Sequence, residues 1–441
     1  MASEAPKPGG DPRTILGTRR MTGPQYAVIG LCVLINMIDG YDILALAQAG
    51  AALKREWGLG DAALGTLLSM NLVGMALGAL GVSPVADQWG RRPAILACLL
   101  FMSAGMALSA ASAGFYPMAA GRIVTGIGIG GMTSTAGMLA LEYAPFRRRE
   151  FASSCVAGAY PVGTIVGAYV AVLVLDSWGW RGIFWAGSAL SLLLFPLAFG
   201  WLAESLDFLL SRQPRQALAR TNRALRRMAI PAIAALPPKP EGARSAVLSE
   251  IVQPLHVREL LKLFLAHALN MFAWYFIINW GPPLVSQLAG DDKAGPLYSS
   301  WVSYGGIAGA LAGGWLCGSW GVKRMMWATM LALAALIALF GQFAGDRQML
   351  WLIAPAMGAM LFASATANWL TIAYAFPPQL RATGLGFGTT AGRVGAVFGP
   401  IVGGRLLGDG LAVGTVCALM AVPAVLSALT FSFARRMEPG R

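Results

Sequence analysis

The chain has little charge and few of the side chains that build metal or redox sites. Only 12% of its 441 residues are Asp, Glu, Lys or Arg, whereas a soluble domain carries about 25%. Its two histidines are too few to form a metal site alone, and its five cysteines all lie in apolar runs without metal or disulfide spacing. We therefore expect a polytopic membrane protein with no metal, no cofactor and no enzymatic site.

Long apolar runs are what the chain has instead. Hydrophobic residues make up 56% of the sequence, and a run of about 20 residues is long enough to cross a bilayer. We predict an all-α membrane protein with twelve transmembrane helices in two sets of six. The expected spans are 26–46, 64–85, 93–113, 117–141, 151–175, 181–202, 263–285, 298–320, 325–343, 349–373, 383–407 and 412–433.

The polar intervals divide the chain into five predicted segments. They are a tail over 1–25, a six-helix bundle over 26–202, a central loop over 203–262, a second six-helix bundle over 263–433 and a tail over 434–441. No cleaved leader is expected, because the first apolar run starts too late and is too long. Residues 212–228 resemble a basic amphipathic helix near the inner membrane surface, and a solvated linker helix is the alternative.

The positive charge is distributed unevenly. Basic residues follow every second predicted helix, whereas the alternate connections are near neutral, which is the positive-inside pattern. We therefore predict cytoplasmic termini and a cytoplasmic central loop, and the net charge of +13 indicates topology rather than a nucleic-acid partner. The basic groups are Arg19 and Arg20, Arg91 and Arg92, Arg147 to Arg149, the cluster from Arg212 to Arg227, Lys323 and Arg324, and Arg435 and Arg436.

The two halves repeat each other. Residues that recur after a displacement of 232 positions are Pro145 with Pro377, Arg149 with Arg381, Gly163 with Gly395, and Gly167 with Gly399. Two repeated six-helix halves joined by a long loop are typical of a secondary transporter, whose substrate binds at the midplane between the halves.

Four charged residues lie well inside the predicted spans, away from their ends. Asp39 and Asp42 share one helix face, and carboxylates at membrane depth usually face a polar cavity, pair with a cation or carry protons. Arg122 lies roughly 8–10 Å below the outer end of its helix, where it can pair with an aspartate and help to hold the substrate; a purely structural pair is the alternative. Arg393 replaces Pro161 of the other repeat, and its two-pronged donor matches a substrate carboxylate.

An aromatic substrate would also need apolar walls. The candidates are Tyr41, Asn270, Trp274 and Trp369, and for each of them lipid contact or packing is the alternative.

The segment from Ser83 to Pro93 resembles the loop signature of the major facilitator superfamily, G-x-x-x-D-x-x-G-R-[RK], with Ser83 in place of glycine. Gly90 permits a tight turn, and Asp87 can pair across the halves or cap a helix. Glu142 and Arg149 resemble a second signature of the superfamily. We expect a conformational gate formed by Asp87, Gly90, Arg91, Arg92, Glu142, Arg149 and Arg381.

The sequence Asp39-Gly40-Tyr41-Asp42 resembles the D-G-x-D motif of the aromatic acid:proton symporter family. The resemblance covers essentially the whole chain and includes Gly121–Gly131, Leu380–Gly384 and Gly392-Arg393. It implies a proton-coupled importer of small aromatic carboxylates such as hydroxybenzoates in the bacterial inner membrane. We expect a monomer in which Asp39 or Asp42 carries the proton. A carrier of aliphatic organic anions or sugars, a drug exporter and a non-transporting sensor of aromatic acids remain alternatives.

Overall fold

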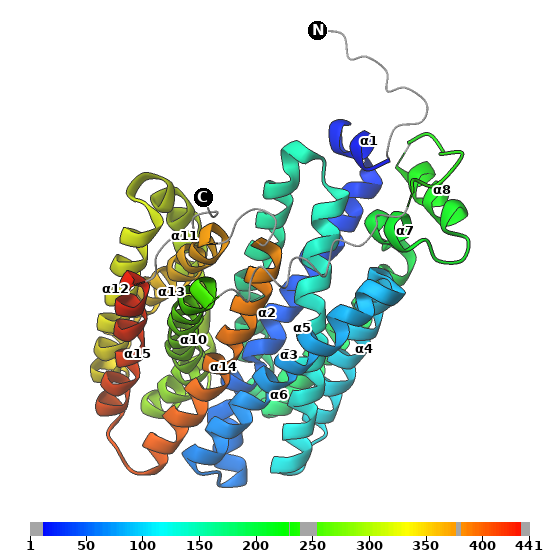
Figure 1. Cartoon of the computed structure of the whole chain (residues 1–441). Coiled ribbons are helices and arrows are strands. Elements are labelled where there is room, and N and C mark those ends of the chain that lie inside the picture. The colour runs from blue at the N-terminus through cyan, green and yellow to red at the C-terminus, as the bar shows by residue number, and fades with distance from the viewer. Residues whose placement is uncertain (1–11, 229, 239–253, 376–380, 434–441) are drawn as a thin grey trace.

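The computed structural model describes residues 12–228, 230–238, 254–375 and 381–433, and every regular element in these ranges is helical. Helices are expected where the chain spans a bilayer, because a helix satisfies its own backbone hydrogen bonds. Figure 1 shows a bundle of long helices with three short helices gathered at one end, close to where α2 begins. We refer to this as the terminal end, because α2 begins and α15 finishes there.

The N-terminal half consists of α2 (Gly23–Trp57), α3 (Asp61–Trp89), α4 (Arg91–Ala110), α5 (Phe115–Tyr143), the 3-10 helix η1 (Phe146–Arg148) and α6 (Arg149–Trp201). The long α6 contains one non-helical residue, Gly179, with φ of 61°. This left-handed position, which glycine adopts without steric penalty, separates the predicted spans 151–175 and 181–202.

The C-terminal half consists of α10 (Pro254–Ala289), α11 (Ala294–Trp320), α12 (Val322–Phe343), α13 (Arg347–Ala375), α14 (Arg381–Gly408) and α15 (Val413–Phe433). The three short helices are α1 (Pro12–Thr18), α7 (Leu206–Arg212) and α8 (Ala217–Arg227). The helix predicted over 212–228 is therefore present as α8, and left-handed Gln213 and Gln216 separate it from α7. α10 begins inside the interval that we predicted as a loop.

Nine helices of the described chain are long and apolar enough to cross a membrane. Two of the predicted spans, 298–320 and 383–407, are not among them, although α11 and α14 are 27 and 28 residues long. Both helices are rich in glycine, which lowers their hydropathy but allows close helix contact. The count of twelve spans therefore stays a prediction.

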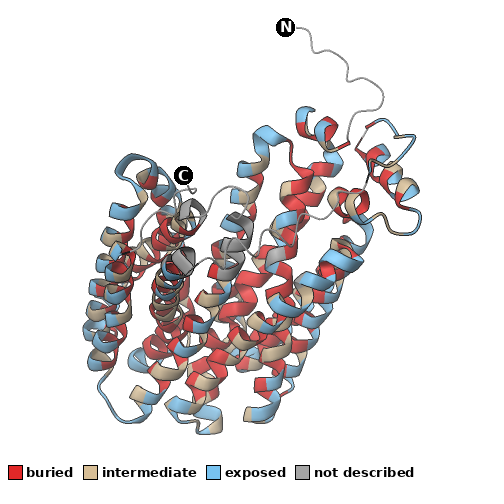
Figure 2. Cartoon of the chain, in the orientation of Figure 1, coloured by how far each residue is buried: buried red, intermediate tan, exposed pale blue. Residues whose placement is uncertain are grey.

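The internal sequence repeat corresponds to a repeat in helix packing. A Cβ added at Gly163 of α6 would lie 1.8 Å from the carbonyl oxygen of Met37 in α2. At Gly395 of α14, the added atom would lie 1.8 Å from the carbonyl oxygen of Ala268 in α10. Glycines 232 positions apart thus bring equivalent helix pairs into backbone contact. Figure 2 shows the buried residues along the inner sides of these helices and the exposed ones on outward faces and connections.

The halves are joined by polar contacts at the end opposite the terminal end. Arg55 forms an ion pair with Asp292, and Asp176 forms one with Lys293. Ser69 of α3 donates to the carbonyl oxygen of Val397 in α14 at 2.8 Å. Two hydroxyl pairs also link α6 with α11, namely Tyr169 with Tyr304 at 3.1 Å and Thr164 with Ser303.

Candidate substrate and proton site

Asp39 of α2 is buried without a hydrogen-bond partner among the described residues. Its exposed fraction is 2%, and both of its carboxylate oxygens are unpaired in that part of the chain. The hydroxyl of Thr133 in α5 lies nearby, but its single proton is donated to the carbonyl of Ile129 at 2.8 Å. Because α2 continues to Trp57, Asp39 lies ~27 Å from the helix end, deeper than the span predicted over 26–46 implies.

Asp42 faces the interior of the N-terminal half. A Cβ added at Gly187 of α6 would lie 2.9 Å from its Oδ1 atom. Arg122 of α5 is fully buried, and its Nη1 donates to the backbone carbonyl of Asp42 at 3.4 Å. The structure therefore makes Arg122 and Asp42 neighbours, but the contact is to the backbone and not to the carboxylate.

The other contacts of Arg122 also lie within the N-terminal half. Its guanidinium stands over the ring of Phe184 at 4.8 Å and donates to Ser109 Oγ at 3.1 Å, Thr125 Oγ1 at 3.0 Å and Met106 Sδ at 2.8 Å. A guanidinium with this many partners has little donor capacity left for a ligand. Asp39, Asp42 and Arg122 together form what we call the acidic group.

Arg393 of α14 lies in a second polar group, built by the C-terminal half. The residue is half-buried, and its Nη1 atom is buried without a partner in the described ranges. Gly392 packs against His267 of α10, because a Cβ there would lie 2.3 Å from His267 Nε2. The Nδ1 atom of His267 hydrogen-bonds with the Asn368 side chain of α13. An unpaired guanidinium nitrogen is a donor available to a carboxylate.

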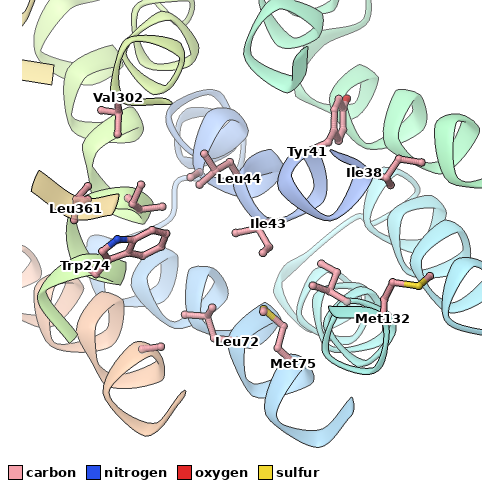
Figure 3. Close-up of a cluster of buried hydrophobic side chains, with 14 of the residues drawn as sticks. Ile38, Tyr41, Ile43, Leu44, Leu72, Met75, Met132, Trp274, Val302 and Leu361 are labelled. Carbon is pink, nitrogen blue, oxygen red and sulfur yellow. The ribbon is translucent and has the colours of Figure 1, made fainter. Parts of the chain in front are cut away.

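Further unpaired groups lie on α10. Asn270 and Trp274 follow His267 at positions i+3 and i+7 and share its helix face. Asn270 is fully buried, and among the described residues neither its amide atoms nor Trp274 Nε1 has a partner. In Figure 3 the indole of Trp274 extends toward Ile43 and Leu44 of α2. Buried polar atoms without partners are rare in folded proteins, and such atoms are suited to bind a water molecule or a ligand.

Aromatic rings connect the two halves. Phe362 of α13 contacts Trp274 edge-to-face with ring centroids 5.8 Å apart, and its ring lies 6.2 Å from that of Tyr160 in α6. The Tyr160 hydroxyl is buried and has no partner in the part of the chain that the structure describes. We call His267, Asn270, Trp274, Phe362 and Tyr160 the aromatic–amide group. Arg393 is linked to it through Tyr275, with which it interacts electrostatically and whose ring centroid lies 4.8 Å from that of Trp274.

The structure does not bring Tyr41 or Trp369 into this group. Tyr41 is buried, and its hydroxyl donates to the backbone carbonyl of Ile183 in α6 at 2.7 Å. Figure 3 shows its side chain directed toward α6 and away from Trp274. Trp369 is 52% exposed, whereas its neighbour Asn368 is fully buried. Adjacent residues of a helix point in different directions, so burial of Asn368 turns Trp369 outward.

Sequence reasoning missed several members of the aromatic–amide group and two further buried amides. His267, Tyr160 and Phe362 were not predicted, and neither were Gln48 and Asn71, whose buried amide atoms are all unpaired among the described residues. A search for amides inside apolar helices would have found Gln48 and Asn71. No local signal marks Phe362, because aromatic residues are common in membrane helices.

The predicted gate residues gather at the terminal end. Arg91 forms an ion pair with Glu142 of α5, which also accepts a hydrogen bond from Ser205. Glu204, which sequence reasoning missed, accepts from the backbone N–H groups of Arg91 and Arg92 at 2.8 Å and 3.1 Å. Acceptors at a helix N-terminus are favourable because the first N–H groups lack helical partners.

The other gate candidates have local contacts. Gly90 adopts φ of 110° between α3 and α4, and a Cβ there would collide with the Glu204 carboxylate. The Arg149 side chain donates to the carbonyl of Ala144 at 3.4 Å. Asp87 accepts a hydrogen bond from Arg212 through its backbone carbonyl. The side chain of Arg381, like Pro377, lies outside what the structure describes.

Comparison with known families decides what kind of molecule this is. The profile of the Major Facilitator Superfamily matches residues 29–400. The chain belongs to this superfamily. This facilitator is a membrane transporter and not an enzyme, in agreement with its apolar helices.

Curated relatives of this facilitator confirm the resemblance stated from the sequence. It is 28% identical to a gallate transporter from Pseudomonas putida over 95% of this chain and 94% of the relative. It is 26% identical to the 4-hydroxybenzoate transporter PcaK from Acinetobacter baylyi over 95% and 93%. Among solved structures, the inward open xylose transporter XylE from E. coli is similar, with a TM-score of 0.73 at 17% identity over 93% of this chain and 96% of that chain. The last similarity concerns the fold alone.

Proposed function

We propose that this facilitator is a proton-coupled importer of small aromatic carboxylates. The observation that carries the proposal is the aromatic–amide group, where buried donors without partners lie beside aromatic rings. A ring carboxylate would satisfy both features, because its carboxyl group needs donors and its ring needs apolar walls. The transporters of gallate and 4-hydroxybenzoate among the relatives support the same substrate class.

In the proposed mechanism, the C-terminal half binds the substrate and the N-terminal half carries the proton. The substrate carboxylate binds Arg393, and its ring lies against Trp274 and Phe362 while Asn270 hydrogen-bonds its polar substituents. The proton resides on Asp39 or Asp42. Arg122, whose donors are occupied inside the N-terminal half, orients Asp42 and is not proposed to touch the substrate.

We propose that coupling between the two groups runs through Tyr160 of α6. Tyr160 lies in ring contact with Phe362, and its backbone carbonyl packs against α2, because a Cβ added at Gly40, next to Asp39, would lie 2.1 Å from that oxygen. We propose that loading of both sites from outside permits closure of the outer end, and that the described contacts across the halves are those of this closed outer end. Substrate and proton then leave toward the terminal end.

The proposed topology has twelve membrane spans with the terminal end in the cytoplasm of a bacterial inner membrane. The break at Gly179 divides α6 into two helices, and α11 and α14 are each long enough to cross a bilayer of about 30 Å at 1.5 Å per residue. The arginines of α8 at the terminal end agree with the positive-inside rule.

Uptake into proteoliposomes tests the function. Purified protein is reconstituted, a pH gradient acid outside is imposed, and accumulation of radiolabelled 4-hydroxybenzoate, gallate and benzoate is followed with and without a protonophore. We expect accumulation of at least one ring acid that the protonophore abolishes. Unlabelled succinate is not expected to compete.

The matched control separates the substrate anchor from general effects of charge. Arg393→Ala should abolish uptake, whereas Arg405→Ala in the exposed last turn of the same helix should leave it unchanged. Transport of aliphatic acids in place of ring acids would contradict the substrate class. Accumulation that survives the protonophore would contradict proton coupling.

A further inference from the structure

Four arginines surround a cavity at the terminal end, far from the central site. The cavity has a volume of about 250 Å³ and lies between α4, the end of α6 and the short helix α8. Arg92 comes from the start of α4, and Arg220, Arg223 and Arg227 come from α8. The last three fall at i, i+3 and i+7, so they form one stripe along the helix.

The three arginines of α8 that line the cavity form no ion pair within the described part of the chain. Among the described residues, none of their side chains makes a hydrogen bond or an ion pair, and Glu204 is the one acidic residue that lines the cavity. The Oε1 atom of Glu204 is already engaged by the backbone N–H groups of Arg91, Arg92 and Ser205. Like charges held side by side repel each other, and an anion in the cavity would relieve this repulsion.

The floor of the cavity is apolar and belongs to membrane-spanning helices. Leu96 of α4 and Phe199 of α6 line it, and Phe199 is 58% exposed. The Arg92 side chain donates to the carbonyl of Phe199 and lies over its ring at 5.3 Å. Exposed apolar residues at the end of a spanning helix face lipid, which places the arginines at the level of the headgroups.

A more apolar groove adjoins the arginine-lined cavity. A second cavity of about 300 Å³ is lined by Val28, Trp201 and Met228, and it shares Arg227, Ala203 and Ala224 with the first. Trp201 is 63% exposed and marks the end of α6, as expected of tryptophan at a membrane interface. A basic cavity with an apolar groove beside it fits a ligand with an anionic head and an acyl chain.

We propose that this cavity binds the phosphate headgroup of an anionic phospholipid, with one acyl chain in the groove beside Trp201. Basic amphipathic helices bind anionic membranes in general, but here Arg92 of the α3–α4 turn and Phe199 close the site into a pocket. A bound lipid would therefore connect α8 with the turn that carries the predicted gate residues. This inference is independent of the transported substrate.

Native mass spectrometry of the full chain tests the proposal. The detergent-solubilised protein is titrated with phosphatidylglycerol and with phosphatidylcholine of the same acyl chains. We expect tighter binding of the first phosphatidylglycerol molecule than of phosphatidylcholine. Arg220→Gln and Arg223→Gln should each weaken that step about fivefold, equivalent to ~1 kcal/mol.

Arg226→Gln is the matched control, because Arg226 is exposed on the same helix but does not line the cavity. It should leave the first binding step within twofold of the unmodified protein. Equal loss in Arg226→Gln would overturn the pocket in favour of unspecific attraction by the helix. Equal affinity for phosphatidylcholine would overturn recognition of the headgroup charge. Competition by millimolar glycerol 3-phosphate would assign the cavity to a soluble phosphate and not to a lipid.

Discussion

At the scale of single residues, Asp39 and Asp42 carry the first prediction. Asp39→Asn or Asp42→Asn should remove uphill uptake driven by a pH gradient, since an amide has the shape of a carboxyl group but carries no exchangeable acidic proton. Counterflow of substrate should persist, because the proposed substrate anchor, Arg393, lies in the other half. We expect a loss of uphill uptake by at least about tenfold in one of the two variants.

The control for this prediction is Asp409→Asn, an exposed aspartate in the connection between α14 and α15. It should transport as the unmodified protein does. Uphill uptake that is retained in both Asp39→Asn and Asp42→Asn would remove the acidic group from the coupling mechanism.

The two buried arginines should respond differently to the same substitution. Arg122→Lys loses several charge-assisted hydrogen bonds and should destabilise the protein by about 2–4 kcal/mol, measured as a lower thermal unfolding midpoint. Arg393→Lys removes few contacts from the substrate-free protein, but it replaces the two-pronged guanidinium donor with a single ammonium group. It should weaken substrate binding in a calorimetric titration and leave the midpoint nearly unchanged. The reverse pattern would exchange the roles assigned to Arg122 and Arg393.

At the scale of helices, the close contact of α2 with α6 depends on Gly163. Gly163→Ala places a methyl group against the carbonyl of Met37, and such overpacking typically costs about 1–3 kcal/mol. Gly158→Ala in the same helix meets open space and should be neutral or stabilise the helix by up to about 1 kcal/mol. Thermal unfolding of both variants tests the contact, and equal midpoints would show that α6 can move away from α2 at little cost.

Sequence reasoning succeeded best for the helices. Apolar composition predicts spans because water is absent from the bilayer core, and most predicted spans correspond to helices of the structure. It was less successful for α11 and α14, where glycine serves packing and reduces hydropathy. The end of α2 was also placed too early, because Gln48, Lys54 and Arg55 extend the helix beyond its apolar part.

Only the charged residues of the candidate site could be predicted from the sequence. Asp39, Asp42, Arg122 and Arg393 stand out because charge is costly in a membrane helix. The direction in which a side chain points is a different question, since it depends on which neighbours a helix face meets. Tyr41 therefore turned out to donate to the backbone of Ile183, and Phe362 was missed although it joins the halves.

At the scale of the whole molecule, closure of the outer end should depend on the two ion pairs between the halves. Exposed pairs contribute about 0–1 kcal/mol each. Loss of both in the double variant Asp292→Asn with Lys293→Gln should therefore shift the equilibrium toward an open outer end by up to about 30-fold. Spin labels at Tyr116→Cys and Gln348→Cys, one in each half, should report longer distances.

The labelling positions are exposed, whereas the native cysteines are buried or half-buried and should react slowly. Asp409→Asn again provides a control, because it removes an outer-end charge that takes part in no pair across the halves among the described residues. An unchanged distance distribution in the double variant would mean that apolar and hydroxyl contacts alone hold the outer end closed.

The same two ion pairs make the resting state of the carrier sensitive to the salinity of its surroundings. Arg55 is 65% exposed and Asp176 is 71% exposed, so dissolved ions reach both pairs. The screening length falls from about 8 Å at physiological ionic strength to about 3 Å at 1 M. In the proposed topology these pairs face the medium and not the buffered cytoplasm. A cell in brackish water would thus hold a larger share of its carriers open to the outside than the same cell in fresh water.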